Sequence, residues 1–148
     1  MIKPFRYTWQ MLDDDVKTFL TQVDFSRYDK ILGVANGAFP LLTKLVNATG
    51  KDFDIVKCIS YENTQQLDDI KVFFSGWGGW KKNEKILIVD DVADSGNTLS
   101  VLSKKLRSFC TVDDIEYLTL CYKPKSTIIP HWYIHEVPND VWIEFCWE

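Results

Sequence analysis

The chain has 148 residues, of which 46% are hydrophobic and 26% charged, with 17 basic and 21 acidic side chains and a formal net charge of −4. This size and apolar fraction predict one globular domain that buries roughly 70% of its unfolded surface, and they exclude a disordered chain. The acidic excess disfavours a nucleic-acid partner, and no apolar run approaches the roughly 20 residues that span a bilayer.

The amino-terminal segment and the cysteines indicate a cytoplasmic protein. MIKPFRYTWQ lacks the apolar run of a signal peptide. The four cysteines, Cys58, Cys110, Cys121 and Cys146, lie far apart and form no C-x-x-C pair. We therefore expect reduced thiols rather than disulfides or a zinc site.

Helical and strand patterns alternate through the first half of the chain. We expect helices over residues 8–23 and from 41 to a C-cap at Gly50, and strands at 30–35, 54–61 and 70–74. A turn at Asn36-Gly37 separates the first strand from the second helix. The polar residues 62–69 predict a loop, and the glycine-rich residues 76–80 predict a turn.

The clearest strand covers residues 85–89, in which Ile86–Val89 is apolar on both faces. Such a strand must be covered on both sides, as in the centre of a parallel sheet. A loop over 90–97, a helix with apolar residues at Leu99, Leu102 and Leu106, and a strand at 115–121 are expected to follow.

This alternation predicts an α/β fold with a mainly parallel sheet of about five strands flanked by helices. The aromatic-rich end of the chain, from Pro130, contains no helical pattern. We expect a single domain over residues 1–148, with a core over about 1–125 and a small carboxyl-terminal hood over about 126–148.

Two acidic residues and a phosphate-binding pattern follow the central strand. Asp90 and Asp91 come directly after Val89, and the segment continues as Asp94-Ser95-Gly96-Asn97-Thr98. A glycine, hydroxyls and N–H groups opening a helix suit a phosphate, whereas two carboxylates suit sugar hydroxyls or a divalent cation. The alternative is a solvated turn in which Asp94 or Ser95 only caps a helix. The doubly buried strand before this pattern favours a functional site.

This segment resembles the phosphoribosyl-diphosphate signature of the type I phosphoribosyltransferases. Other segments narrow the resemblance to purine members similar to the bacterial xanthine-guanine phosphoribosyltransferases. They are the opening Tyr7–Leu12, the strand end Cys58–Tyr61, the dipeptide Lys123-Pro124 and the ending Val137–Glu148. The resemblance covers nearly the whole chain and implies the type I phosphoribosyltransferase fold.

The resemblance implies transfer of phosphoribose from 5-phosphoribosyl diphosphate to guanine, xanthine or hypoxanthine in purine salvage, with release of pyrophosphate. It implies that Asp94 faces the purine N7 as a proton acceptor or hydrogen-bond partner. It assigns the 5′-phosphate to Ser95, Gly96, Asn97 and Thr98, and the ribose hydroxyls to Asp90 and Asp91, directly or through Mg²⁺.

The same resemblance assigns the base and the metal to residues near the end of the chain. Lys123 would donate to the purine 6-oxo group, Trp142 would stack on the base, and the backbone of Ile143 would read the 2-substituent. Glu148 would contact Mg²⁺ or pyrophosphate. An ordinary surface lysine, a core tryptophan and a frayed terminus are the alternative interpretations. The family also implies a homodimer or homotetramer.

The chain departs from the family at the pyrophosphate turn. Asn36, before Gly37, stands where these enzymes usually carry Arg or Lys. Losing that cation removes a charge-assisted contact, for which Lys71, Lys81 and Lys82 are possible substitutes. Further departures are Asp68 where a basic residue is common, Cys146 in place of proline, and Asn97, which would have to tolerate a left-handed conformation.

Two other patterns are weaker. His131 and His135 would lie about 13 Å apart on an extended segment and could not share one metal ion. Trp77 and Trp80 are typical of a hairpin tip, a subunit contact or a mobile loop rather than of nucleic-acid stacking.

Three other functions are considered. A receiver domain also pairs acids with a strand-end Lys-Pro, but it needs the acids after its first strand, where this chain has Val34-Ala35-Asn36. A nucleotide-sensing protein that kept the site but lost turnover is motivated by Asn36. A pyrimidine or orotate phosphoribosyltransferase is disfavoured by Lys123 and the hood.

Overall fold

A computed structural model describes residues 2–60, 70–75, 83–109 and 112–148. Its helices are α1 (Trp9–Gln22), α2 (Phe39–Thr49) and α3 (Asn97–Phe109), with a short 3-10 turn η1 (Phe25–Arg27). Its strands are β1 (Phe5–Tyr7), β2 (Lys30–Ala35), β3 (Phe53–Ser60), β4 (Ile70–Phe74), β5 (Glu84–Ala93), β6 (Val112–Tyr122), β7 (His135–Glu136) and β8 (Ile143–Phe145). The loop predicted at 62–69, the turn at 76–80 with its two tryptophans, and Cys110 lie outside the described residues.

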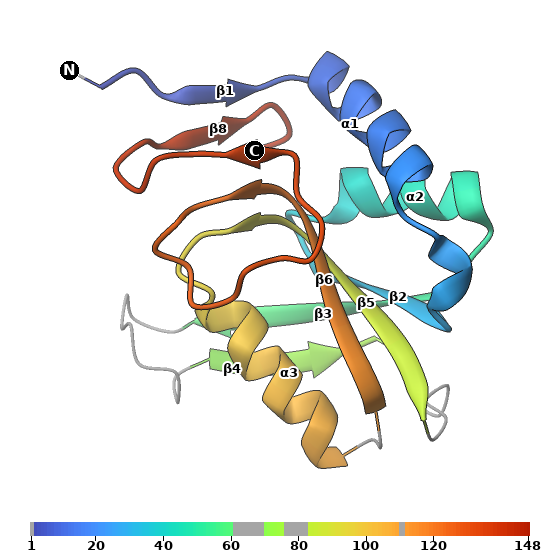
Figure 1. The fold of residues 1–148 in the computed structure, drawn as a ribbon. Coiled ribbons are helices and arrows are strands. Elements are labelled where there is room, and N and C mark those ends of the chain that lie inside the picture. Colours follow the sequence, from blue (N-terminus) through green and yellow to red (C-terminus); the bar gives the residue numbers. More distant parts are fainter. Residues whose placement is uncertain (1, 61–69, 76–82, 110–111) are drawn as a thin grey trace.

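The main sheet has six strands in the order β4-β3-β2-β5-β6-β7 (Figure 1). All neighbouring pairs are parallel except β3 and β4, which are antiparallel. The predicted α/β fold with a mainly parallel sheet is therefore confirmed. The prediction of about five strands missed β7, because two residues in an aromatic-rich segment carry no periodicity.

Strand β5 lies at the centre of the sheet, and its apolar run is buried on both faces. Ile86, Leu87, Ile88 and Val89 are all fully buried. Leu87 and Val89 pack in one core with α1 and α2, whereas Ile86 and Ile88 pack in a second core with α3. Alternate residues of the strand thus face opposite helical layers, as predicted from its two-sided apolar pattern.

The helix ends follow local chemistry. The Thr8 hydroxyl accepts a hydrogen bond from the Met11 N–H (3.1 Å) and caps α1. Helix α2 ends at Gly50, whose φ of +69° permits the left-handed C-cap that the sequence predicted. None of the three described helices is long and apolar enough to cross a membrane.

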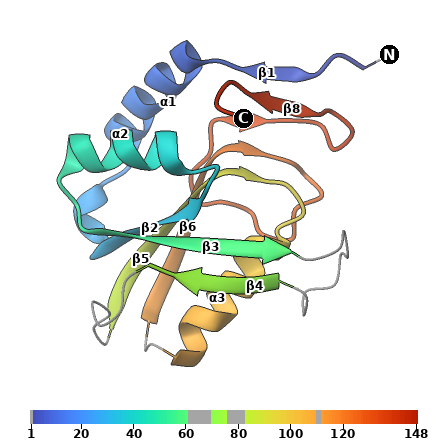
Figure 2. The ribbon, with the colours of Figure 1, turned by 180° about the vertical axis from the view of Figure 1, so that it is seen from behind.

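The carboxyl-terminal segment contains no helix among residues 123–148 and is held to the start of the chain. Strand β8 pairs with β1 in a small parallel sheet, with Phe5 opposite Ile143. This sheet lies beyond the carboxyl ends of β5 and β6 (Figures 1 and 2). The end of the chain is thereby brought over the edge of the main sheet where the acidic pair lies.

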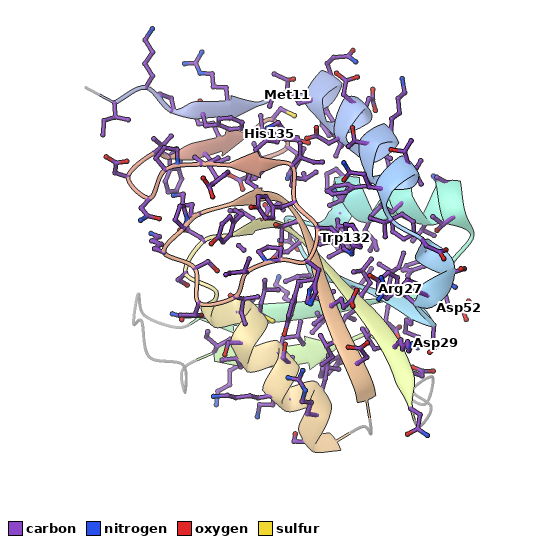
Figure 3. All side chains as sticks on the ribbon, viewed as in Figure 1. Met11, Arg27, Asp29, Asp52, Trp132 and His135 are labelled. Carbon is purple, nitrogen blue, oxygen red and sulfur yellow. The ribbon has the colours of Figure 1, made fainter. Side chains whose placement is uncertain are left out.

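A buried polar cluster connects the carboxyl-terminal segment and β1 to helix α1. The Tyr7 hydroxyl donates to Asp15 Oδ2 (2.5 Å), and His135 Nε2 lies 2.8 Å from the same oxygen. Burial and the Asp15 carboxylate both raise the pKa of Tyr7, so this phenol stays protonated and keeps donating. His135 lies beside the start of α1 (Figure 3).

Candidate active site

A pocket of about 190 Å³ opens where β5 leads into α3. It lies at the carboxyl ends of the parallel strands, the usual place for ligands in such sheets. The pocket is lined by Asp90, Asp91, Val92, Ala93, Asp94, Ser95, Gly96, Thr98 and Leu99. All but one of the residues of the predicted phosphoribosyl signature from Asp90 to Thr98 therefore line one cavity, the exception being Asn97.

The acidic pair belongs to the strand rather than to the loop after it. Strand β5 continues to Ala93, so the loop predicted from residue 90 begins only at Asp94. Hydrogen bonding to β6 extends this far because Asp90 pairs with Thr119 and Ala93 with Tyr122. The sheet thus fixes the backbone from which the carboxylates of Asp90 and Asp91 extend.

Burial raises the pKa of both acids. The pKa of Asp90 is raised well above its ordinary value by burial and by the neighbouring Asp91 carboxylate. Burial raises the pKa of Asp91 to about 6, and the negative charge of Glu148 adds to this effect. The charged forms of both acids are therefore disfavoured in the ligand-free protein, and a cation or the hydroxyls of a ligand would favour them.

The turn from Asp94 to Thr98 presents backbone groups at the start of α3. The Asn97 N–H donates to Ser95 Oγ (3.2 Å), and the Ser100 N–H donates to the Gly96 carbonyl (2.9 Å). Gly96 has a φ of +85°, and a Cβ there would lie 2.6 Å from Thr127 Oγ1. Only glycine meets both demands. The left-handed conformation considered for Asn97 is thus at Gly96, since Asn83 is the only non-glycine residue with positive φ in the described part of the chain.

Two lysines from the segment after β6 meet Asp94. Lys123 Nζ lies 3.7 Å and Lys125 Nζ 3.1 Å from Asp94 Oδ1. Lys123 is almost fully buried, and its backbone N–H donates to the Ala93 carbonyl (3.0 Å). The strand-end position predicted for Lys123 is therefore confirmed. Sequence reasoning missed Lys125, although its Lys-x-Lys spacing placed it in the same turn.

The turn after β2 lies beside the acidic pair. The peptide bond between Ala35 and Asn36 is cis, and Asn36 is exposed. Gly37 lies so close to Asp91 that a Cβ would overlap its carboxylate. The predicted pyrophosphate turn and the acidic pair are therefore neighbours.

Strand register brings a lysine beside this turn that the sequence did not single out. Ala35 pairs with Lys57 on β3, as Gly33 pairs with Ile55. A Cβ on Gly33 would meet the side chain of Leu42 in α2, so this row of residues faces α2. The exposed Lys57 thus lies next to the turn on the face that α2 covers. Lys71 is one strand further away on β4, and Lys81 and Lys82 lie outside the described residues.

The residues predicted to hold the base are in the carboxyl-terminal segment. Trp142 is 69% exposed, which excludes the alternative of a core tryptophan, whereas Ile143 is buried. The Phe5 N–H donates to the Trp142 carbonyl (2.8 Å) and fixes this backbone against β1. Among the described residues, no hydrogen bond or ion pair joins Trp142 or Ile143 to Asp94 or Lys123.

The two histidines have different partners. His131 Nδ1 accepts a hydrogen bond from the Tyr117 N–H (3.0 Å), whereas His135 contacts Asp15. Within the described ranges, no group of three or more His, Cys, Asp or Glu side chains is arranged to hold a metal ion.

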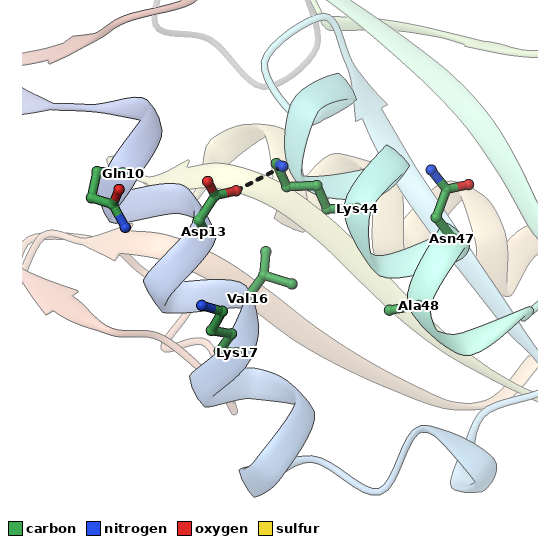
Figure 4. A pocket seen from close by; sticks show the side chains of 7 residues that line it. All are labelled: Gln10, Asp13, Val16, Lys17, Lys44, Asn47 and Ala48. Atoms are coloured by element: carbon green, nitrogen blue, oxygen red, sulfur yellow. Dashed lines mark ion pairs between the residues drawn. The ribbon is translucent and has the colours of Figure 1, made fainter.

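A second, larger pocket of about 690 Å³ lies between α1 and α2 (Figure 4). An ion pair between Lys44 Nζ and Asp13 Oδ1 (2.7 Å) crosses it. It is lined by Gln10, Asp13, Val16, Lys17, Lys44, Asn47 and Ala48, none of which belongs to the signature.

Comparison with known proteins agrees with this geometry. The family model described as "Phosphoribosyl transferase domain" matches residues 8–148. The chain is 29% identical over 150 residues to a xanthine-guanine phosphoribosyltransferase of Nitratidesulfovibrio vulgaris, covering 99% of this chain and 85% of that protein.

Solved structures of purine phosphoribosyltransferases share the fold, as two of them illustrate. The purine phosphoribosyltransferase of Pyrococcus horikoshii has a TM-score of 0.83 at 23% identity, covering 99% of this chain and 95% of that one. The xanthine-guanine-hypoxanthine phosphoribosyltransferase of Helicobacter pylori has a TM-score of 0.81 at 24% identity, covering 97% and 93%.

Proposed function

Because the chain belongs to the phosphoribosyl transferase domain family, we propose that it transfers phosphoribose from 5-phosphoribosyl diphosphate to a 6-oxopurine and releases pyrophosphate. The observation that carries this proposal is the single pocket that joins the acidic pair, Asp94 and the turn before α3. Its substrate would be guanine, xanthine or hypoxanthine, the bases named for the relatives.

The 5′-phosphate would bind at the start of α3. Ser95, Gly96, Asn97 and Thr98 supply hydroxyls and N–H groups there, and the helix dipole favours an anion. The close packing of Gly96 against residues 126–128 keeps this turn rigid. A rigid turn fixes the ribose relative to the base, which is how positioning accelerates such a transfer.

Asp90 and Asp91 would hold the ribose hydroxyls, directly or through Mg²⁺. The residues fit this ion, because two adjacent carboxyl groups line one pocket and the cost of burying their charged forms would be offset by a cation. Mg²⁺ commonly uses one or two carboxylates, with water and substrate oxygens completing its shell, so no larger protein cluster is needed. When bound, it would neutralise charge on pyrophosphate. Glu148 is close enough to act on Asp91 and would contact the same ion or pyrophosphate.

Asp94 would face the purine N7 as proton acceptor or hydrogen-bond partner, and Lys123 would donate to the 6-oxo oxygen. Asp94 lines the pocket, and Lys123 Nζ lies 3.7 Å from Asp94 Oδ1, so both groups could contact one base. A buried ammonium that donates to an oxygen disfavours adenine, whose amino group leaves it unpaired. Trp142, with its exposed ring, would stack on the base, and the backbone of Ile143 would read the 2-substituent.

The assembly and compartment belong to the same proposal. Exposed Phe53 and Phe73, on the neighbouring strands β3 and β4, favour a homodimer or homotetramer. The described cysteines Cys58, Cys121 and Cys146 are unpaired, as is usual in the cytoplasm. Light scattering after gel filtration measures the number of copies.

A nucleotide-sensing role without turnover is the second candidate, and the exposed, uncharged Asn36 favours it. A pyrophosphate-release assay with Mg²⁺, 5-phosphoribosyl diphosphate and each base in turn separates the two. Release with guanine, xanthine or hypoxanthine but not with adenine or orotate supports the proposed enzyme. Nucleotide binding without release from any base would favour the sensor.

A further inference from the structure

The segment after β6 is hydrogen-bonded to the residues on both sides of Asp94. The Lys123 N–H donates to the Ala93 carbonyl (3.0 Å), and the Thr127 N–H donates to the Ser95 carbonyl (2.9 Å). Lys125 lies midway between these two anchors, and its ammonium reaches Asp94 itself. The chain thus holds the backbone before and after Asp94, and the carboxylate between them.

Lys125 is the closer of the two cations. Its Nζ lies 3.1 Å from Asp94 Oδ1, within hydrogen-bond distance, whereas Lys123 Nζ lies 3.7 Å away, beyond it. Both ion pairs end on Oδ1, and within the described part of the chain Oδ2 accepts no hydrogen bond from the protein. The carboxylate is therefore held by one oxygen and offers the other.

The backbone of Lys125 is fixed from the carboxyl-terminal segment. Its N–H donates to the Asn139 side-chain oxygen (2.8 Å), and the Ser126 N–H closes a turn on the Lys123 carbonyl (2.9 Å). A lysine on a mobile backbone would gain little from an exposed ion pair, because ordering it costs entropy. Here the backbone is already ordered, so less freedom is lost when the ammonium meets Asp94.

We infer that Lys125 is a positioning residue that holds Asp94 Oδ1, so that Oδ2 is the oxygen that accepts from the purine N7. This inference rests on the proposed function, and it assigns different roles to the two lysines. Lys125 orients Asp94, and Lys123 stays available for the oxygen of the base.

The test combines Lys125→Met with Asp94→Asn. In the wild-type background we expect K125M to lower kcat about tenfold, while KM for 5-phosphoribosyl diphosphate changes less than about threefold. K125R, which keeps the charge, should recover at least about a third of kcat. In the D94N background, K125M should change kcat less than twofold, because no carboxylate remains to be held.

Lys44→Met is the matched control. Lys44 forms an ion pair with Asp13 at 2.7 Å, and its side chain is 40% exposed, compared with 46% for Lys125. This pair lies in the α1–α2 pocket rather than in the active site (Figure 4). We expect K44M to leave kcat within twofold of wild type.

Two outcomes overturn the inference: a K125M enzyme with wild-type kcat, or an equal loss in the wild-type and D94N backgrounds. If the wild-type protein releases no pyrophosphate with any of the bases, this different result removes the proposed function instead. In that case calorimetry with guanosine monophosphate decides, because K125M should still weaken binding at least about threefold, and only when Asp94 is present. Unchanged affinity in that measurement would discard the role of Lys125.

Discussion

Gly37 lies against the carboxylate of Asp91, so close that no side chain fits between them. One residue belongs to the turn after β2 and the other to the end of β5, two parallel strands that are hydrogen-bonded neighbours. The contact joins the predicted pyrophosphate turn to the residues predicted to bind the ribose and the metal, so a change at Gly37 should affect ligand binding.

Gly37→Ala should force the turn away from the acidic pair. We expect a loss of about 1–3 kcal/mol in the free energy of unfolding, together with at least tenfold weaker binding of 5-phosphoribosyl diphosphate. Urea denaturation and calorimetry measure the two effects. Gly50→Ala is the control, because Gly50 has positive φ but no atom within 4 Å of a Cβ. G50A should lower stability without changing ligand affinity, and equal affinities of G37A and wild type would contradict the role of the contact.

The raised pKa of Asp91 makes the stability of the ligand-free protein depend on pH. The pKa of Asp91 is about 6 in the folded protein, above its ordinary value of 3.8. Between these two pH values the folded state therefore holds a proton that the unfolded chain has lost. The free energy of unfolding is therefore highest, as far as Asp91 determines it, below pH 3.8. It falls as the pH rises through about 6, by up to about 3 kcal/mol in total.

Asp91→Asn should remove the part of this dependence that comes from Asp91 and raise the free energy of unfolding at pH 8, while the raised pKa of Asp90 leaves a remainder. Urea unfolding with a chelator present, at pH 5 and pH 8, measures it, with the exposed Asp114→Asn as control. If D91N and wild type lost the same stability between these two pH values, the dependence would have another source. Deprotonation also prepares the site for a cation, so Mg²⁺ affinity should rise as the pH passes about 6.

Lys123→Met keeps the length of a nearly buried side chain and removes its charge. The preference for an oxopurine over adenine, as a ratio of kcat/KM values, should fall at least about tenfold. Lys104→Met, on the exposed face of α3, is the control and should leave the ratio unchanged. An unchanged ratio in K123M would remove Lys123 from base selection.

Asn36→Arg should restore a cation at the pyrophosphate turn. We expect the KM for 5-phosphoribosyl diphosphate to fall about three- to tenfold, because a guanidinium forms charge-assisted hydrogen bonds with phosphate oxygens. The register of β2 and β3 makes Lys57 the neighbouring cation in the natural chain. Lys57→Met should therefore raise this KM in the wild type and less so in N36R. Lys71→Met, one strand further from the turn, should not. Identical effects of K57M and K71M would show that only overall charge matters.

The central layers and the chemistry of the signature could be predicted from the amino-acid sequence alone. A short run that is apolar on both faces and is followed by a turn pattern favours a covered strand, so Ile86–Val89 predicted β5 at the centre. The acids, glycine and hydroxyls that follow it are contiguous, so they had to share one strand end and one turn. Local patterns also predicted helix α1, the end of α2 at Gly50 and the strand β4.

The distant segments that contact this turn could not be predicted, because they are brought to it by the arrangement of the strands and helices. Gly37 with Asp91, Lys125 with Asp94, and Lys57 with Ala35 are contacts between different elements, and they depend on strand order and register. Periodicity specifies which face of an element is apolar, but not which neighbour lies beside it. The short strands β7 and β8 were missed for the same reason. Their conformation is imposed by pairing with β6 and β1 rather than by their own few residues.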